Sequence, residues 1–198
     1  MIKNIIFDFD GVIVDSGPFH LKHLNEWGGL HVSPEEFYEK HKGNVYEPKE
    51  RTNFDNLDWV AYKKYTYETE IKQELDRECL VFLQSNQDKE LSIVSSGIEK
   101  NMIGFLKEHN IYKDFDLVLG KESDHSKVIK IKRVLEGKDI SESIFITDTL
   151  GDIKECHEVG IKVIAVDFGF HTQETLREGK PHAICSSWPD VQQVIDNI

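Results

Sequence analysis

Short apolar runs recur along the chain, and each is followed by small or acidic residues. The runs cover residues 2–9, 91–94, 115–119, 144–146 and 161–166, and residues 183–184 could add a short edge strand. Continuous apolar runs of this length are typical of strands that are buried on both faces. The pattern therefore predicts a sheet covered by other elements on both sides.

Helical patterns lie between these runs. Residues 98–109 place Ile98, Met102 and Phe105 on one face, and residues 127–136 and 150–159 show the same spacing of apolar positions. Glycine follows each of the last two segments, at the position where it commonly ends a helix. Strands that alternate with helices indicate βαβ units. We therefore predict an α/β fold with a doubly wound, parallel, Rossmann-like sheet.

One segment interrupts the alternation. Residues 16–84 contain no convincing strand, and residues 19–27 and 59–78 have helical patterns. Ser33 and Pro34 followed by Glu36 form a capping box, with Val32 and Phe37 placed as a hydrophobic staple. We predict a helical cap domain at residues 16–84, inserted after the first strand of a core made of residues 1–15 and 85–198. We expect its aromatic residues to form mainly a small core: Trp27, Phe37, Tyr38, Phe54, Trp59, Tyr62 and Tyr65.

Composition excludes several classes of function. The 198 residues include 24 Lys and Arg against 36 Asp and Glu, which gives a net charge of −12. This excess of negative charge disfavours binding to nucleic acids and to anionic membranes. No run approaches the ~20 apolar residues of a membrane-spanning helix, and the apolar start is too short for a signal peptide. Three separated cysteines indicate neither a disulfide framework nor a zinc site, so we expect a cytoplasmic protein. The pattern specifies no oligomeric state.

Candidate chemistry follows the ends of the predicted strands. In an open parallel sheet, ligands bind beyond the carboxyl ends of the strands. Asp8 and Asp10 follow the first run, and Asp148 and Asp152 follow the fourth. Several carboxylates at one sheet edge repel each other unless a cation offsets their charge, and oxygen-rich sites suit Mg²⁺. The sequence therefore predicts a Mg²⁺ site whose candidate ligands are these four aspartates.

Four segments together resemble the motifs of the haloacid dehalogenase-like hydrolases. Residues 8–12, Asp-Phe-Asp-Gly-Val, resemble the first motif, DxDG[VT], and the strand that ends at Ser95 resembles the second. Lys127 resembles the lysine of the third motif. Lys121 and Lys130 compete for this role, and we prefer Lys127 because it opens the helix that precedes the fourth run. Residues 144–152 resemble the fourth, GDxxxD, with Thr147 at the position of the usual glycine. The inserted segment is similar to a C1-type cap, as in the beta-phosphoglucomutase-like branch.

The resemblance implies roles for the four aspartates. Asp8 would be the nucleophile that forms an aspartyl-phosphate. Asp10 would protonate the leaving oxygen and then activate water. Mg²⁺ would be held by Asp8, by the backbone carbonyl of Asp10 and by Asp148, with Asp152 either on the ion or directly behind it.

It also implies residues that hold the phosphoryl group. Ser95 and Lys127 would contact its oxygens, helped by the amides of Ser96 and Gly97. Gly11 would let the backbone turn and approach the ligand closely. In the cap, His20 would help couple closure to proton transfer, and Lys42 would contact the substrate.

The activity implied is that of a Mg²⁺-dependent phosphatase acting on a small phosphorylated metabolite. Two alternatives within the fold are a beta-phosphoglucomutase-like sugar-phosphate mutase and a catalytically silent binding protein. None of the four arginines stands where a mutase would hold a second phosphate, which favours hydrolysis: Arg51, Arg77, Arg133 and Arg177. A receiver domain has no insertion after its first strand, and dehalogenases use one aspartate without a metal, so both are disfavoured.

Overall fold

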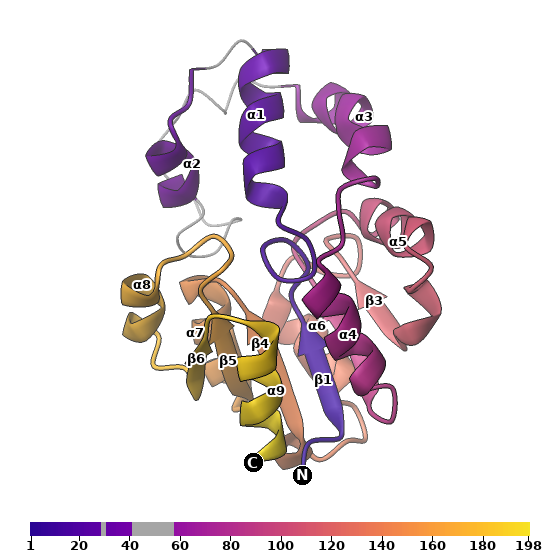
Figure 1. Ribbon diagram of the computed structural model, residues 1–198, viewed down its shortest axis with the longest axis vertical. Coiled ribbons are helices and arrows are strands. Elements are labelled where there is room, and N and C mark those ends of the chain that lie inside the picture. The colour runs from indigo at the N-terminus through magenta and orange to yellow at the C-terminus, as the bar shows by residue number, and fades with distance from the viewer. Residues whose placement is uncertain (29–30, 41–57) are drawn as a thin grey trace.

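A computed structural model describes residues 1–28, 31–40 and 58–198 (Figure 1). Its sheet has the strand order β3-β2-β1-β4-β5-β6, and every neighbouring pair is parallel. The strands are β1 (Asn4–Phe7), β2 (Glu90–Val94), β3 (Leu117–Leu119), β4 (Ser143–Thr147), β5 (Lys162–Val166) and β6 (Ala183–Cys185). The predicted α/β class with a doubly wound parallel sheet is confirmed, and β6 lies at an edge as expected.

The first strand is shorter than its apolar run. The run extends to Phe9, whereas β1 ends at Phe7. The carbonyl of Phe9 accepts from the amides of Val12, Ile13 and Val14. Gly11 in this turn has a φ of 78°, a conformation that side chains disfavour. The tight turn, not a loss of hydrophobicity, ends the strand.

Helices cover both faces of the sheet. Alternating side chains of β1 point to opposite faces, so Ile5 and Phe7 belong to one core cluster and Ile6 to the other. The first cluster includes side chains of α4 (Arg77–Ser85), α5 (Glu99–Glu108) and α9 (Trp188–Asp196). The second includes side chains of α6 (Lys127–Val134), α7 (Leu150–Val159) and α8 (Gln173–Glu178). Short 3₁₀ turns, η2 (Tyr112–Asp114) and η3 (Ile140–Glu142), precede β3 and β4.

The helix ends follow local chemistry. Gly160 has a φ of 84° and caps α7, as the sequence predicted. Helix α6 ends at Val134, two residues before the predicted end, and Gly137 has a φ of 76° in the turn beyond it. Within the described residues, no helix combines the length and apolarity needed to cross a bilayer.

The inserted helices lie beyond the carboxyl ends of the strands (Figure 1). They are α1 (Ser16–Gly28), α2 (Pro34–Lys40) and α3 (Trp59–Glu70). The capping box of α2 is present, because the Ser33 amide donates to Glu36 Oε2 (3.0 Å) and the Glu36 amide donates to Ser33 Oγ (3.2 Å).

A small cluster of buried residues holds these helices together: Leu24, Val32, Phe37 and Tyr62, with Trp27 and Tyr38 packed against it. Tyr65 is 52% exposed and stacks on Trp27. Phe54 and the side chain of Trp59 lie outside the described residues.

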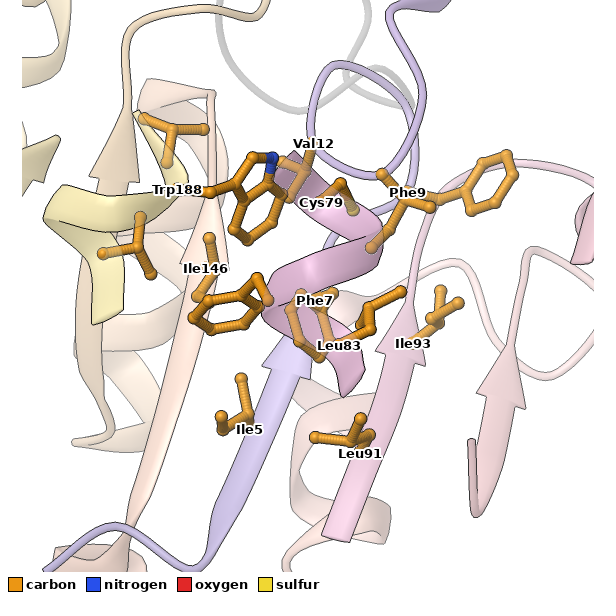
Figure 2. Packing of buried hydrophobic residues seen from close by; sticks show 14 of the residues in the cluster. Ile5, Phe7, Phe9, Val12, Cys79, Leu83, Leu91, Ile93, Ile146 and Trp188 are labelled. Atoms are coloured by element: carbon orange, nitrogen blue, oxygen red, sulfur yellow. The ribbon is translucent and has the colours of Figure 1, made fainter. Parts of the chain in front are cut away.

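Helix α4 falls, except for its last residue, within the predicted cap range, 16–84, but packs with the core. Its Cys79, Phe82 and Leu83 are buried in the cluster that includes Phe7 and Ile93 (Figure 2). The predicted helix 59–78 is also divided, because α3 ends at Glu70 and α4 begins at Arg77. We therefore propose to place the domain boundary before α4, so that this helix belongs to the core.

Candidate active site

Three elements bring Asp8, Lys127 and Asp152 into contact. Asp8 directly follows β1, and its amide continues the sheet pairing by donating to the Ile146 carbonyl (2.9 Å). Lys127 is the first residue of α6, and its Nζ donates to Asp8 Oδ2 (2.7 Å) and to Asp152 Oδ2 (2.6 Å). All three residues are buried. One ammonium therefore joins two carboxylates that are far apart in the sequence.

Asp152 is held from a second side. The Thr147 hydroxyl donates to the same Oδ2 atom of Asp152 (2.7 Å) and accepts from the Thr149 amide (3.2 Å). Thr147 is fully buried at the end of β4. The sequence showed threonine where glycine is usual, and the structure shows what this hydroxyl contacts.

Asp148 lies against two glycines. Its Oδ2 accepts from the Phe170 amide (2.7 Å), and a Cβ added at Gly11 or Gly169 would lie 1.9 or 2.3 Å from that oxygen. No side chain larger than glycine fits at either position. The Oδ1 atom of Asp148 is buried and has no hydrogen-bond partner among the described residues.

Asp10, Ser95 and Gly97 meet at a neighbouring point. Asp10 Oδ1 accepts from the Ser16 hydroxyl (2.6 Å), and Ser95 Oγ accepts from the Gly97 amide (3.0 Å). A Cβ added at Gly97 would lie 3.2 Å from Asp10 Oδ2 and 3.4 Å from Ser95 Oγ. Ser96, between Ser95 and Gly97, is half-buried. The carboxyl ends of β1 and β2 thus present a carboxylate, a hydroxyl and a glycine loop together.

Burial and crowding shift the acidities of this group. Burial raises the pKa of Asp8 well above its ordinary value. The Lys127 ammonium opposes this rise, and the carboxylates of Asp152 and Asp148 add to it. Burial also raises the pKa of Asp148, to about 7. Burial alone would raise the pKa of Asp152, but Lys127 holds it below its ordinary value. Burial alone would lower the pKa of Lys127, but Asp152 and Asp8 raise it.

The donor chemistry fits a hard dication. Two buried carboxylates, those of Asp8 and Asp152, share the Lys127 ammonium, and among the described residues a buried oxygen of Asp148 has no hydrogen-bond donor. An oxygen ligand that lacks a donor in a crowded acidic site suits Mg²⁺, whose charge favours ionised carboxylates. In the part of the chain that the structure describes, no three Asp, Glu, His or Cys side chains already surround one point.

Of the two cap residues predicted for the site, the structure describes His20. His20 lies in α1, where its Nδ1 is 3.4 Å from the Tyr62 hydroxyl and its ring packs on Phe19. Lys42 lies outside the described residues.

Two residues that the predicted site did not include also lie at its edge. Phe170 follows β5, and its ring contacts those of Phe37 and Tyr38 in α2 (centroids 6.1 and 5.7 Å apart) while its amide binds Asp148. Lys130 is 1% exposed and donates from Nζ to the carbonyls of Ser95 and Gly120.

The sequence held a signal for Lys130 but none for Phe170. The buried face of α6 has the spacing 127, 130, 131 and 134, so Lys130 stands in an apolar row beside Ile131. Phe170 sits in a loop, where no periodic pattern marks it.

Comparison with known proteins adds to this geometry. The sequence profile of the family described as haloacid dehalogenase-like hydrolase matches residues 5–166. Phosphoglycolate phosphatase of Synechococcus elongatus is 22% identical over 215 aligned positions, which cover 100% of this chain and 99% of that protein. A protein of Dickeya dadantii named "Probable phosphatase IndB" is 24% identical over 114 residues. That match covers 55% of this chain and half the length of the relative.

The fold also matches solved structures. A crystal structure described as a predicted phosphatase from Clostridium acetobutylicum superposes with a TM-score of 0.82 at 18% identity, covering 100% of both chains. The match includes the cap as well as the sheet, and at this identity it shows the shared fold.

Proposed function

The chain belongs to the haloacid dehalogenase-like hydrolase family, and from this premise we propose that it is a Mg²⁺-dependent phosphatase that acts through an aspartyl-phosphate. One observation carries the proposal: the buried Asp8–Lys127–Asp152 contact stands beside Asp10 and Ser95 at the carboxyl edge of the sheet. The family name covers hydrolysis of different bonds, so the reaction has to be argued from the residues.

Asp8 is the proposed nucleophile. Its Oδ1 accepts from the Phe9 amide (2.7 Å), and its Oδ2 accepts from Lys127. These two contacts fix the plane of the carboxylate, which positions an oxygen for attack on phosphorus. The attack forms an oxygen–phosphorus bond to Asp8 and breaks the bond to the leaving oxygen.

Asp10 is the proposed acid and base. The Ser16 hydroxyl holds its Oδ1, and its Oδ2 is directed toward Gly97 and Ser95. Asp10 gives a proton to the leaving oxygen in the first step. In the second step it takes a proton from the water that attacks the aspartyl-phosphate, which restores Asp8 and releases phosphate.

Ser95 and the following amides are proposed to hold the phosphoryl oxygens. Phosphoryl transfer needs positioning and neutralisation of charge more than covalent assistance. The Ser95 hydroxyl and the amides of Ser96 and Gly97 would position the phosphoryl oxygens. The Lys127 ammonium would neutralise their charge. Gly11 permits the close approach of Asp148 to the same edge.

Asp8, the Asp10 carbonyl and Asp148 would hold Mg²⁺. The ion would neutralise the crowded carboxylates and the oxygens of the phosphoryl group. Asp152 already accepts from Lys127 and Thr147 on one oxygen, which supports a role behind the ion.

The proposed substrate is a small phosphorylated metabolite. The aromatic contact between α2 and Phe170 brings the cap against the Asp148 side of the site, where it can exclude water. 2-Phosphoglycolate is the first compound to test, because the relative that spans the whole chain is a phosphoglycolate phosphatase. We keep His20 and Lys42 as proposed cap contacts and the cytoplasm as the proposed location.

The test measures phosphate release from p-nitrophenyl phosphate and from 2-phosphoglycolate with Mg²⁺, then with EDTA. Asp8→Asn should abolish release and the covalent phosphate that mass spectrometry detects after acid quenching. Asp88→Asn, an exposed aspartate before β2, is the matched control and should retain full activity. Substantial turnover by Asp8→Asn would exclude the nucleophile role, and no release from any phosphoester would exclude the phosphatase. Isomerisation of a sugar phosphate with little release would instead indicate a mutase.

A further inference from the structure

Lys130 is a buried lysine that contacts no carboxylate at hydrogen-bond distance among the interactions of the described residues. It lies one helical turn after Lys127 on α6 and is 1% exposed. Its Nζ donates to the carbonyl of Ser95, which follows β2, and to the carbonyl of Gly120, which follows β3 (3.3 Å for the second). The ammonium therefore joins two neighbouring loops at the carboxyl edge of the sheet.

These two loops are also joined through their backbones. The Ser95 amide donates to the Leu119 carbonyl (2.9 Å), and the Lys121 amide donates to the Gly97 carbonyl (2.9 Å). A Cβ at Gly120 would lie 2.6 Å from the Gly97 carbonyl oxygen, so the backbones meet as closely as glycine allows. The loop that begins at Ser95 is thus held by its neighbour, and Lys130 is the cation that binds both.

A lysine is a costly choice for this position. Burial, and secondarily the Lys127 ammonium, lowers the pKa of Lys130 to about 8. The folded environment therefore disfavours the charged form of Lys130. A methionine would fill the same space without desolvating an ammonium. Ile131 and Val134 already provide the apolar packing of this helix face. Packing alone therefore gives no reason for a lysine here.

We propose that Lys130 is a positioning residue for phosphate binding: by holding the Ser95 carbonyl, it directs the Ser95 hydroxyl and the amides of Ser96 and Gly97 toward the phosphoryl group. This proposal rests on the proposed function. In this proposal, the two buried lysines of α6 have different roles. Lys127 binds the carboxylates that carry the chemistry, whereas Lys130 binds the carbonyls of the loop that receives the phosphate.

The two lysines predict different kinetic effects. Removing Lys127 should lower kcat, because Asp8 loses its partner. Removing Lys130 should weaken phosphate binding and leave the chemistry close to intact, because its bonds end on loop carbonyls. A variant of Lys130 with a higher KM and a nearly unchanged kcat would therefore indicate a role in positioning the loop. A general loss of structure would lower kcat as well.

The experiment compares Lys130→Met with Lys132→Met, an exposed lysine of the same helix. The kinetic probe is p-nitrophenyl phosphate, with inorganic phosphate as the competing ligand. For Lys130→Met we expect KM and the phosphate inhibition constant to rise about tenfold, with kcat within about threefold of the wild type. At pH 7 the urea midpoint of Lys130→Met should remain near that of the wild type, and Lys132→Met should match the wild type throughout.

Amide hydrogen exchange gives a second measurement that needs no turnover. In Lys130→Met, the amides of Ser96 and Gly97 should exchange about tenfold faster, while those of β4 remain unchanged. Unchanged exchange would overturn the proposal, and so would an unchanged KM. If Lys130→Met does not fold, Lys130→Gln, which keeps an N–H donor, should show both effects in reduced size. A wild type that releases no phosphate would refute the proposed function, and the exchange measurement would then decide the role of Lys130 alone.

Discussion

Replacing Thr147 with valine removes one hydroxyl from the interior of the site and keeps the branched shape of the side chain. The hydroxyl donates to Asp152 Oδ2 at 2.7 Å, and Thr147 has no exposed surface. Water therefore cannot replace the lost donor. A hydrogen bond to a charged acceptor contributes about 1.5–3 kcal/mol.

The expected loss of unfolding free energy is about 2 kcal/mol. The Thr149 amide also loses its acceptor, at 3.2 Å, but this hydrogen bond is only partly buried, so we expect its loss to add little. For a chain of this size, about 2 kcal/mol corresponds to a fall in Tm of roughly 4–8 °C. Urea unfolding should show a lower midpoint with an unchanged m value, because the surface exposed on unfolding is the same.

A double-mutant cycle assigns the loss to the contact with Asp152. The four proteins are the wild type, Thr147→Val, Asp152→Asn and the double variant. We expect a coupling free energy of about 1–2 kcal/mol. Thr147→Ser is the control, because it keeps the hydroxyl and should lose only about 1 kcal/mol with the methyl group. A coupling below about 0.5 kcal/mol would show that the hydroxyl does not hold Asp152 and would refute the reasoning.

Four further predictions concern the site. Asp10→Asn should accumulate the phosphorylated protein, detected by mass spectrometry after acid quenching, because water is no longer activated; an absence of accumulated phosphate on Asp8 would reassign the base. Mg²⁺ at about a hundred times its Kd should raise the unfolding free energy by about 3 kcal/mol, EDTA should remove this gain, and Asp148→Asn should lose most of it; an equal gain in that variant would place the ion elsewhere. Lys130 has a folded pKa of about 8, below its ordinary 10.5, so the unfolded chain binds more protons between these values. Wild-type stability should therefore rise by about 1–2 kcal/mol relative to Lys130→Met between about pH 7 and about pH 9.5, and parallel pH curves in urea unfolding would contradict the burial of a charged amine. Gly120→Ala should raise KM and lower stability by about 1–3 kcal/mol, because its Cβ would collide with the Gly97 carbonyl, and wild-type kinetics would show that the loops can separate freely.

Local patterns predicted most of the secondary structure. Each predicted apolar run overlaps a strand, and the Ser33–Glu36 capping box begins α2 where expected. Both features depend on neighbours in the sequence: burial of a strand requires a run of apolar residues, and a cap requires an acceptor beside the first free amides. Helix α4 is different, because its sequence fits a cap helix equally well. Our proposal to place it in the core rests on its Cys79 and Leu83, which are buried in the same cluster as side chains of the sheet.

The candidate site was predictable only as a group. The rule for parallel sheets places Asp8, Ser95 and Asp148 at one edge, because each follows a strand. It does not say which lysine joins Asp8, and Lys121, Lys127 and Lys130 all precede β4. In the structure Lys127 contacts Asp8 and Lys130 contacts the loop carbonyls. Lys127 and Lys130 are three residues apart on α6, which corresponds to a rotation of about 300° around the helix axis. Their side chains therefore leave the helix in different directions and reach different partners.

By itself, the sequence determined the parallel sheet, the inserted helices and the edge at which the acidic residues gather, because hydrophobic periodicity and strand connectivity are written along the chain. The tertiary structure alone decided the partners. It shows which carboxylates accept from Lys127, which buried Asp148 oxygen has no donor among the described residues, and what the buried polar groups of Thr147 and Lys130 contact. These contacts join residues up to 119 positions apart. Their geometry depends on how separate helices pack against one sheet, which no local pattern specifies.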